Sequence, residues 1–442
     1  MIRYLLLVSP LLLLINSCSQ KETVHEEKQF INITTKDVHQ CNIELEKAII
    51  EDYFSPPIAS RIYVYPNIAA YECLRTDSSN YQPLSHFYSE LAILPNTLSI
   101  HQRKIAAIYA FYTVGKELVY SSSGIDTALI HFTKQLQTTS LDTTWKAARS
   151  YGEHVAKVIV QWSQKDGYKE MRSASHYELI NEPNKWIPTP PDYSDALEPH
   201  WGTLRSFTLD SAAQFKPAPP TEFSLDTTSL FYQELMEVYQ AVKALKEDEP
   251  AIAKFWDCNP IVPKHQGHGT FSEKKLTPGG HWMNIGRMAM KEQKIQSLEE
   301  VSKDYVLLSI AIHDAFISCW KEKYTSHYIR PVTVIQKHID PDWTPILLTP
   351  NFPEYPSGHS VVSAAAATIL TDLFGDQYAF TDSTEVPFGM PPRSFSSFYK
   401  ASNEAAISRL YGGIHFRPAI DNGIIQGRKV GNHVLTALQL EK

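Results

Sequence analysis

Apolar residues recur at helical spacing along most of this chain, and strand signals are sparse. The clearest stripe follows Trp145, where Ala148, Val155 and Ile159 fall on one face of a helix. The same spacing predicts helices over 42–54, 60–74, 86–121, 126–137, 143–165, 229–255, 296–324, 359–374, 397–412 and 418–440. The pattern therefore predicts an all-α fold, which we expect to form two packed helical bundles.

Two segments interrupt the helical pattern. Residues 183–224 contain eight prolines and should form a long surface loop or lid. Residues 259–281 are rich in Gly and His and are expected to form a second loop, in which His265, His268 and His281 are solvated. We therefore divide the chain into an N-terminal helical region, 41–255, and a C-terminal helical bundle, 256–442.

The first residues of the chain indicate export and a lipid anchor. The apolar run that starts at Tyr4 is too short to span a bilayer permanently. It ends in Ile-Asn-Ser-Cys, which resembles a bacterial lipobox and implies removal of residues 1–17 and acylation of the Cys18 sulfur. The polar residues 18–40 are expected to form a flexible tether. We therefore expect the protein in the cell envelope, attached to a membrane in the periplasm or at the outer membrane through Cys18.

Composition excludes several other classes of protein. The net charge is −7 with a pI near 6.2, which disfavours a nucleic-acid partner, and no nucleotide-binding glycine motif occurs. Cys41, Cys73, Cys258 and Cys319 form no CxxC pair, so a zinc site built on thiols is not expected. Their disulfide pairing and the oligomeric state stay open.

Positively charged residues follow the most apolar of the predicted helices. Trp320 and Lys323 are three residues apart and share a helix face, and Arg330 follows directly before Pro331. Because Pro331 disfavours a helical Arg330, the helix should end there. The position of these cations at the end of a core helix indicates a shielded site rather than a solvated surface.

Two further segments carry candidate site residues. Pro356-Ser357-Gly358-His359 precedes a helix of small residues, where Ser357 is placed as the N-cap and free N–H groups could bind an anion. Arg409 lies in the last turn of another helix, and His415 lies in the short link that follows it. Together the three segments supply one Lys, two Arg, two His and a hydroxyl, with no carboxylate. This set suits a tetrahedral or trigonal-bipyramidal oxyanion better than a divalent cation.

The three motifs resemble those of the superfamily shared by vanadium-dependent haloperoxidases and type 2 phosphatidic acid phosphatases. The shared pattern is Lys-x6-Arg-Pro, Pro-Ser-Gly-His and Ser-Arg-x5-His, and it spans residues 320–421 here in the same order and spacing. The resemblance implies the helical haloperoxidase/acid phosphatase-like fold, with the oxyanion site in the C-terminal bundle.

The resemblance also implies a role for each matching residue. Lys323, Arg330 and Arg409 would hold the equatorial oxygens of vanadate, as vanadium(V), or of phosphate, and Ser357 and the Gly358 N–H would hydrogen-bond the same oxygens. His415 would be the axial ligand to vanadium or the phosphate-accepting nucleophile, and His359 would be the acid or base at the opposite apex. Many relatives carry an Asp four residues after the nucleophilic His, where this chain has Ala419; Asp421 is the nearest acid.

Aromatic residues beside this set favour the haloperoxidase. Trp320 and Phe352 match aromatic positions beside vanadate in chloroperoxidase-like relatives, and the chain is longer than the resemblance implies for a minimal phosphatase. The expected reaction is oxidation of iodide or bromide by hydrogen peroxide to hypohalite equivalents. The alternative is an acid phosphatase that hydrolyses phosphomonoesters through a phosphohistidine. A tethered binding protein with an inactive site would require loss of a key group, and every group is present.

Overall fold

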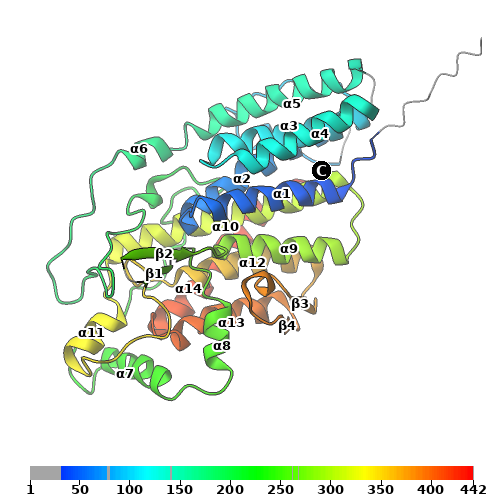
Figure 1. Cartoon of the computed structure of the whole chain (residues 1–442). Coiled ribbons are helices and arrows are strands. Elements are labelled where there is room, and N and C mark those ends of the chain that lie inside the picture. The colour runs from blue at the N-terminus through cyan, green and yellow to red at the C-terminus, as the bar shows by residue number, and fades with distance from the viewer. Residues whose placement is uncertain (1–30, 77–79, 140–141, 261, 267, 442) are drawn as a thin grey trace, which may run out of the picture.

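A computed structural model describes residues 31–76, 80–139, 142–260, 262–266 and 268–441, and it is mostly helical (Figure 1). The first half contains α1 (Thr35–Glu51), α2 (Pro56–Leu74), η1 (Leu84–His86), α3 (Ile100–Leu118), α4 (Ser123–Thr139), α5 (Asp142–Ser163), α6 (Tyr168–Arg172) and η2 (Trp201–Thr203). The second contains α7 (Leu230–Lys243), α8 (Glu249–Phe255), β1 (Val262–Gln266), β2 (Gly269–Glu273), α9 (Pro278–Glu292), α10 (Leu298–Ser326), α11 (Pro331–His338), α12 (Gly358–Phe374), β3 (Phe380–Asp382), η3 (Val386–Phe388), β4 (Arg393–Phe395), α13 (Phe398–Tyr411) and α14 (Arg417–Ala437). The all-α prediction is confirmed.

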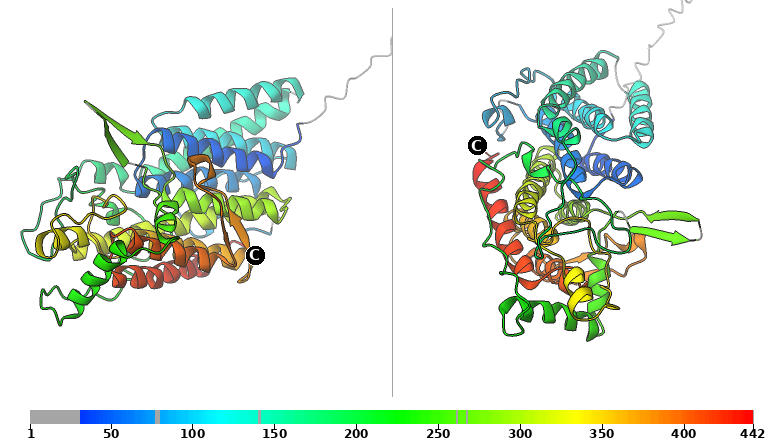
Figure 2. Two further views of the ribbon diagram at one scale, coloured as in Figure 1. Left: turned by 60° about the horizontal axis from the view of Figure 1, so that its bottom comes forward. Right: turned by 90° about the vertical axis from the view of Figure 1, so that its left-hand side faces the viewer.

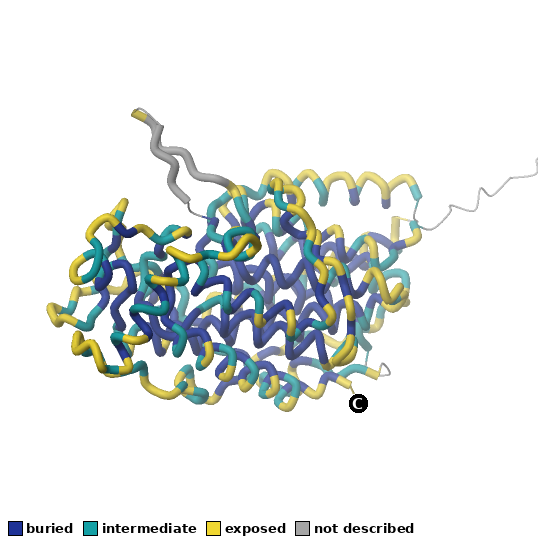
Figure 3. The backbone as a smooth tube through the Cα atoms, turned by 90° about the horizontal axis from the view of Figure 1, so that it is seen from below, coloured by how far each residue is buried: buried dark blue, intermediate teal, exposed yellow. Residues whose placement is uncertain are grey.

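Two helical bundles share α10 as their common central helix. On one side α10 packs against α2, which in turn packs against α3 and α5. On the other side it packs against α12, which carries α13 and α14 (Figure 1). One continuous apolar core runs through both bundles. Seen from below, the buried backbone lies along the central helices and the exposed backbone lies at the rim (Figure 3). The two-bundle prediction therefore holds, with a shared helix between the bundles.

A row of glycines lets α14 lie directly against α12. Gly423, Gly427 and Gly431 follow one another every four residues, so they lie on one face of α14. A Cβ atom at Gly427 would lie 2.1 Å from the Val361 carbonyl oxygen of α12. The amide of Ser357, at the start of α12, donates to the Ala419 carbonyl of α14 at 3.0 Å. The close contact of these two helices therefore places the start of α12.

Several element boundaries differ from the sequence prediction. The helix predicted over 86–121 begins only at Ile100, because Ser99 and Gln102 form a capping box. The helix predicted over 229–255 is divided into α7 and α8. The predicted loop 259–281 contains the β1–β2 hairpin, which projects from the helical body (Figure 2), and the first turn of α9. Pro331 is the first residue of α11, a short helix that the sequence analysis did not predict.

The predicted tether, residues 18–40, extends too far, because a helix begins within it. Helix α1 begins at Thr35, and Val38 and His39 are buried in the core, so residues 35–40 belong to the folded body. Cys18 and the predicted leader lie outside the described residues. Among the residues described, no helix combines the length and apolar character needed to cross a membrane. The four described cysteines are unpaired and buried.

The packing of α14 on α12 can be tested at a single glycine. Gly427→Ala should lower the free energy of unfolding by about 1–3 kcal/mol, because the added methyl group meets the α12 backbone. Gly124→Ala in α4 is the matched control. Its methyl group meets nothing within 4 Å, so the change should be neutral or stabilise by up to about 1 kcal/mol. Urea denaturation measures both; equal stability of the two variants would contradict the packing described here.

Candidate active site

A cavity of about 140 Å³ lies where α10, α12 and the α13–α14 link meet. The predicted site residues that line it are Trp320, Phe352, Gly358, His359, Arg409 and His415. Lys323 and Arg330 are fully buried beside it, with Lys323 Nζ 4.9 Å and Arg330 Cζ 5.1 Å from the centre of the Phe352 ring. The fold therefore brings the three sequence motifs together.

Lys323 is held by backbone oxygens at the end of α10. Its Nζ donates to the carbonyls of Pro353, Glu354 and Pro356 at 2.9, 3.0 and 2.6 Å. An ammonium group has three donors, so all three are directed at oxygens of one segment. Burial lowers the pKa of Lys323 to about 7. The lysine thus fixes the course of residues 353–356 and brings positive charge beside the cavity.

Backbone carbonyls bind part of each arginine side chain, and another nitrogen of each has no acceptor among the described residues. Arg330 Nε donates to the Phe352 carbonyl at 3.0 Å and Nη1 to the Ile414 carbonyl at 2.8 Å. Arg409 Nη1 donates to the Trp256 carbonyl at 2.9 Å. Within the described part of the chain, Arg330 Nη2 and Arg409 Nε are buried and have no hydrogen-bond partner. Buried guanidinium nitrogens of this kind need an acceptor.

Helix α12 begins as the sequence predicts. Ser357 is its N-cap, and the Ser357 hydroxyl accepts from the Ser360 amide at 3.3 Å. Because Gly358 and His359 are in the first turn, their N–H groups have no acceptor within the helix. His359 Nε2 is buried without a partner among the described residues. The positive end of α12 therefore faces the cavity beside His359.

His415 is oriented by a carboxylate that the sequence reading missed. Its Nδ1 lies 2.8 Å from Glu354 Oε1, and the same oxygen accepts from the Phe416 amide at 2.9 Å. A proton on Nδ1 leaves Nε2 with a free lone pair, and Arg330 Nη1 lies 3.3 Å from that Nε2 as a donor. Glu354 therefore sets the tautomer of His415 and directs Nε2 toward the cations.

The position of Glu354 shows that two predictions from the sequence were wrong. The site was expected to contain no carboxylate, and Asp421 was the nearest candidate to orient His415. Asp421 is instead exposed on α14, and His415 is bound by Glu354. Glu354 lies between prolines and aromatic residues in the segment that leads to His359. The sequence signal that could have identified Glu354 was a single acidic residue in an otherwise apolar segment.

The charged groups beside the cavity suit an anion. Lys323, Arg330 and Arg409 are buried beside the cavity, and the carboxyl groups nearest to them are those of Glu354, which is hydrogen-bonded to His415, and Asp257. Burial, followed by the charges of the three cations, holds the pKa of His415 well below its usual range. Burial and the Arg409 charge do the same to the pKa of His359. Both imidazoles are therefore neutral, and the unsatisfied guanidinium nitrogens fit the oxygens of vanadate or phosphate.

The proline-rich loop covers this cavity. Its residues Thr189, Pro190, Pro191, Asp192, Ser194 and Leu197 line the cavity wall. The Leu197 carbonyl accepts from Trp320 Nε1 at 3.3 Å and from the Tyr324 hydroxyl at 2.7 Å, which attaches the loop to the end of α10. Of the histidines expected to be solvated, His268 is exposed and the His265 side chain lies outside the described part. The expectation is wrong for His281, which is fully buried in α9.

Comparisons with known proteins identify similar sequences and folds. Residues 303–440 match the family described as the VCPO second helical-bundle domain. No curated protein sequence matches the chain. Two bacterial vanadium-dependent chloroperoxidase structures, holo-type and apo-type, are similar in fold, with 19% and 17% identity. Each alignment covers 88% of this chain. The holo-type alignment covers 92% of that chain with a TM-score of 0.65, and the apo-type alignment covers 94% with a TM-score of 0.66.

A bacterial vanadium-dependent iodoperoxidase of known structure is much more similar. It shares 42% sequence identity with this chain, and the alignment covers 94% of this chain and 99% of that one with a TM-score of 0.87. The motif order, the converging cations and this identity over nearly the whole length lead to one conclusion: the chain belongs to the vanadium-dependent haloperoxidases.

Proposed function

We propose that this protein oxidises iodide or bromide with hydrogen peroxide to hypohalite equivalents, with iodide the preferred halide. The observation that carries the proposal is the set of buried, unsatisfied nitrogens at Arg330 and Arg409 beside His415, whose Nε2 lies 3.3 Å from Arg330 Nη1. Iodide is favoured because it is the most easily oxidised of these halides. The 42% identical relative is an iodoperoxidase, which supports the same choice.

The residues divide the work according to their contacts. Vanadate, when bound, supplies a Lewis acid that activates hydrogen peroxide for oxidation of the halide. Arg330 and Arg409 would hold the oxygens of the anion through their unsatisfied nitrogens. Lys323 was expected to hold these oxygens too, but its three donors are bound to carbonyls, so it would act through its charge. The Ser357 hydroxyl and the Gly358 N–H add hydrogen bonds at the start of α12.

The two histidines have different tasks. His415 would hold the vanadium through Nε2, because its Nδ1 is bound to Glu354. His359 would be the acid–base group: its Nε2 has no partner among the described residues, and its lowered pKa keeps the ring neutral. In the proposed reaction, His359 takes up the proton that hydrogen peroxide loses.

The size and lining of the cavity favour the haloperoxidase over the phosphatase. The volume is about 140 Å³, and the rings of Trp320 and Phe352, 4.9 Å apart, form an apolar wall. Residues of the proline-rich loop form another part of the wall. Peroxide and a halide ion fit such a space, whereas a phosphate ester with a large alcohol needs more room.

Paired assays on one preparation test the proposed reaction. Protein reconstituted with vanadate should oxidise iodide with peroxide well above the rate of free vanadate. His415→Ala should lose bound vanadium, and His359→Ala should keep most of the vanadium while losing turnover. Vanadate-free protein is assayed for hydrolysis of an aryl phosphate in parallel. Phosphate release that vanadate inhibits, without halide oxidation, would reverse the assignment in favour of the phosphatase.

The role of Glu354 is tested by vanadate affinity. Glu354→Gln keeps the size of the side chain but weakens the hydrogen bond that directs His415, so vanadate affinity should fall about 10- to 100-fold. Asp421→Asn is the matched control and should leave the affinity unchanged, since Asp421 is exposed. Equilibrium dialysis with vanadium determination measures both. A loss in Asp421→Asn rather than in Glu354→Gln would restore the sequence-based expectation.

We also propose that the enzyme is held in the cell envelope by a lipid on Cys18, on the periplasmic side or at the outer membrane. The support is the apolar leader and the Ile-Asn-Ser-Cys motif, together with the polar residues that follow. Cys18→Ser should abolish incorporation of labelled palmitate and release the protein from the membrane fraction. Cys41→Ser, a change in the core of α1, is the control and should keep the label. Unchanged labelling of Cys18→Ser would reject the anchor.

A further inference from the structure

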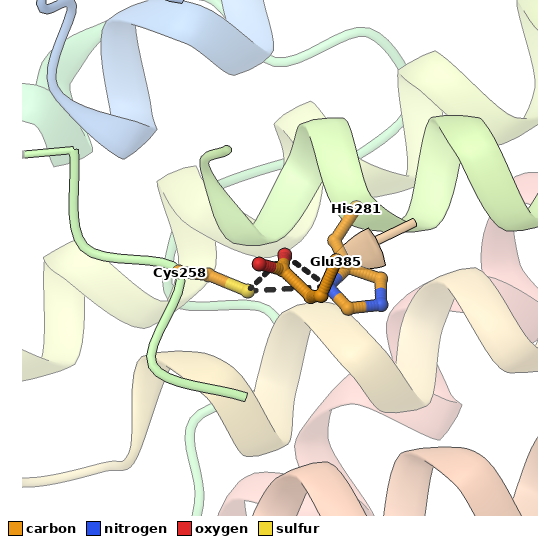
Figure 4. A group of neighbouring side chains, drawn as sticks. All are labelled: Cys258, His281 and Glu385. Carbon is orange, nitrogen blue, oxygen red and sulfur yellow. Dashed lines mark hydrogen bonds and ion pairs between the residues drawn. The ribbon is translucent and has the colours of Figure 1, made fainter. Parts of the chain in front are cut away.

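A second group of potential ligands lies beside the proposed vanadate site, and one of its members, Cys258, also lines the cavity. Cys258, His281 and Glu385 come from three separate elements: the link after α8, the first turn of α9 and the residue before η3 (Figure 4). All three side chains are buried. Cys258 is separated from His281 by 23 positions and from Glu385 by 127, so no spacing rule on the sequence could have joined them. The fold alone places them together.

The distances within this group match a tetrahedral metal site. Cys258 Sγ lies 3.2 Å from His281 Nδ1, His281 Nδ1 lies 3.2 Å from Glu385 Oε1, and the sulfur lies 3.9 Å from that oxygen. Zinc bonds of ordinary length at tetrahedral angles separate neighbouring ligand atoms by about 3.3–3.6 Å. A zinc ion therefore fits between the three atoms with small side-chain adjustments and leaves one position for water.

The surroundings of His281 are those of a metal-bound imidazole. Its other nitrogen, Nε2, lies 2.7 Å from Asp382 Oδ2 and 2.7 Å from Thr384 Oγ1. A carboxylate on the far nitrogen is the usual partner of a zinc-binding histidine, because it holds the ring with the near nitrogen free to coordinate. Cys258 has a positive φ of 41°, a rare conformation outside glycine, which the contacts around the cluster must hold in place.

We propose that Cys258, His281 and Glu385 bind a zinc ion that is separate from the vanadate. The ion would join the link after α8 to α9 and to η3. Trp256, two residues before Cys258, stacks on His281 with ring centres 4.6 Å apart, and its carbonyl accepts from Arg409. The zinc site therefore supports the backbone oxygen that positions one of the vanadate-binding arginines.

Metal content of the full-length protein tests the proposal. Purified wild-type protein, supplied with zinc during expression, should contain about one zinc per chain after dialysis, as expected for a site with three protein ligands. Cys258→Ser and Glu385→Gln should retain less than about a tenth of that amount. Cys73→Ser, another fully buried cysteine, and Asp248→Asn, a surface carboxylate, are the matched controls and should keep the zinc.

Two further measurements keep the test independent of folding and of turnover. Replacement of zinc by Co²⁺ should produce a sulfur-to-cobalt charge-transfer band in the wild type that is absent in Cys258→Ser. His415→Ala, which should lose vanadium, should still bind one zinc per chain. Wild-type protein without zinc and without a cobalt–sulfur band would overturn the proposal, and so would equal zinc content in Cys258→Ser. Failure of iodide oxidation alone would bear only on the proposed reaction.

Discussion

The structure depends on a concentration of buried positive charge that the protein itself does not balance. Lys323, Arg330 and Arg409 are removed from water around one cavity. The carboxyl groups nearest to them, those of Glu354 and Asp257, form no ion pair with them among the described residues. Burying uncompensated charge costs several kcal/mol per ion. Such an arrangement persists only if the rest of the fold holds it and an anion completes it. The same imbalance that costs stability gives the site its affinity for vanadate.

The helical scaffold supplies the rigidity that this charge requires. Helix α10 lies in the core of both bundles, so the lysine at its end has little freedom to move toward water. Lys323 is also tied to three carbonyls of the segment that leads into α12. The glycine face of α14 brings α12 close, and this contact sets the start of α12 at the cavity. Packing that extends through the molecule thus holds the buried charged groups in place.

Backbone oxygens connect the site to its surroundings. The carbonyls of Phe352 and Ile414 hold Arg330, and that of Trp256 holds Arg409. Positions of these oxygens depend on segments without regular helix, which need support of their own. The Glu354–His415 contact supports one side, and the cluster around His281 supports the segment that contains Trp256. Catalytic geometry in this family member therefore rests on residues outside the recognisable motifs.

The sequence by itself determined the helical class, the three motifs and the residues that meet at the cavity. These are local properties: helical periodicity, the N-cap at Ser357 and fixed spacing around Lys323, His359 and Arg409. Only the tertiary structure decided which acid orients His415, that the proline-rich loop contributes to the cavity wall, and that Cys258 meets His281. The physical reason is that these contacts join residues far apart in the chain, and hydrogen-bond partners at such separation leave no periodic or spacing signal.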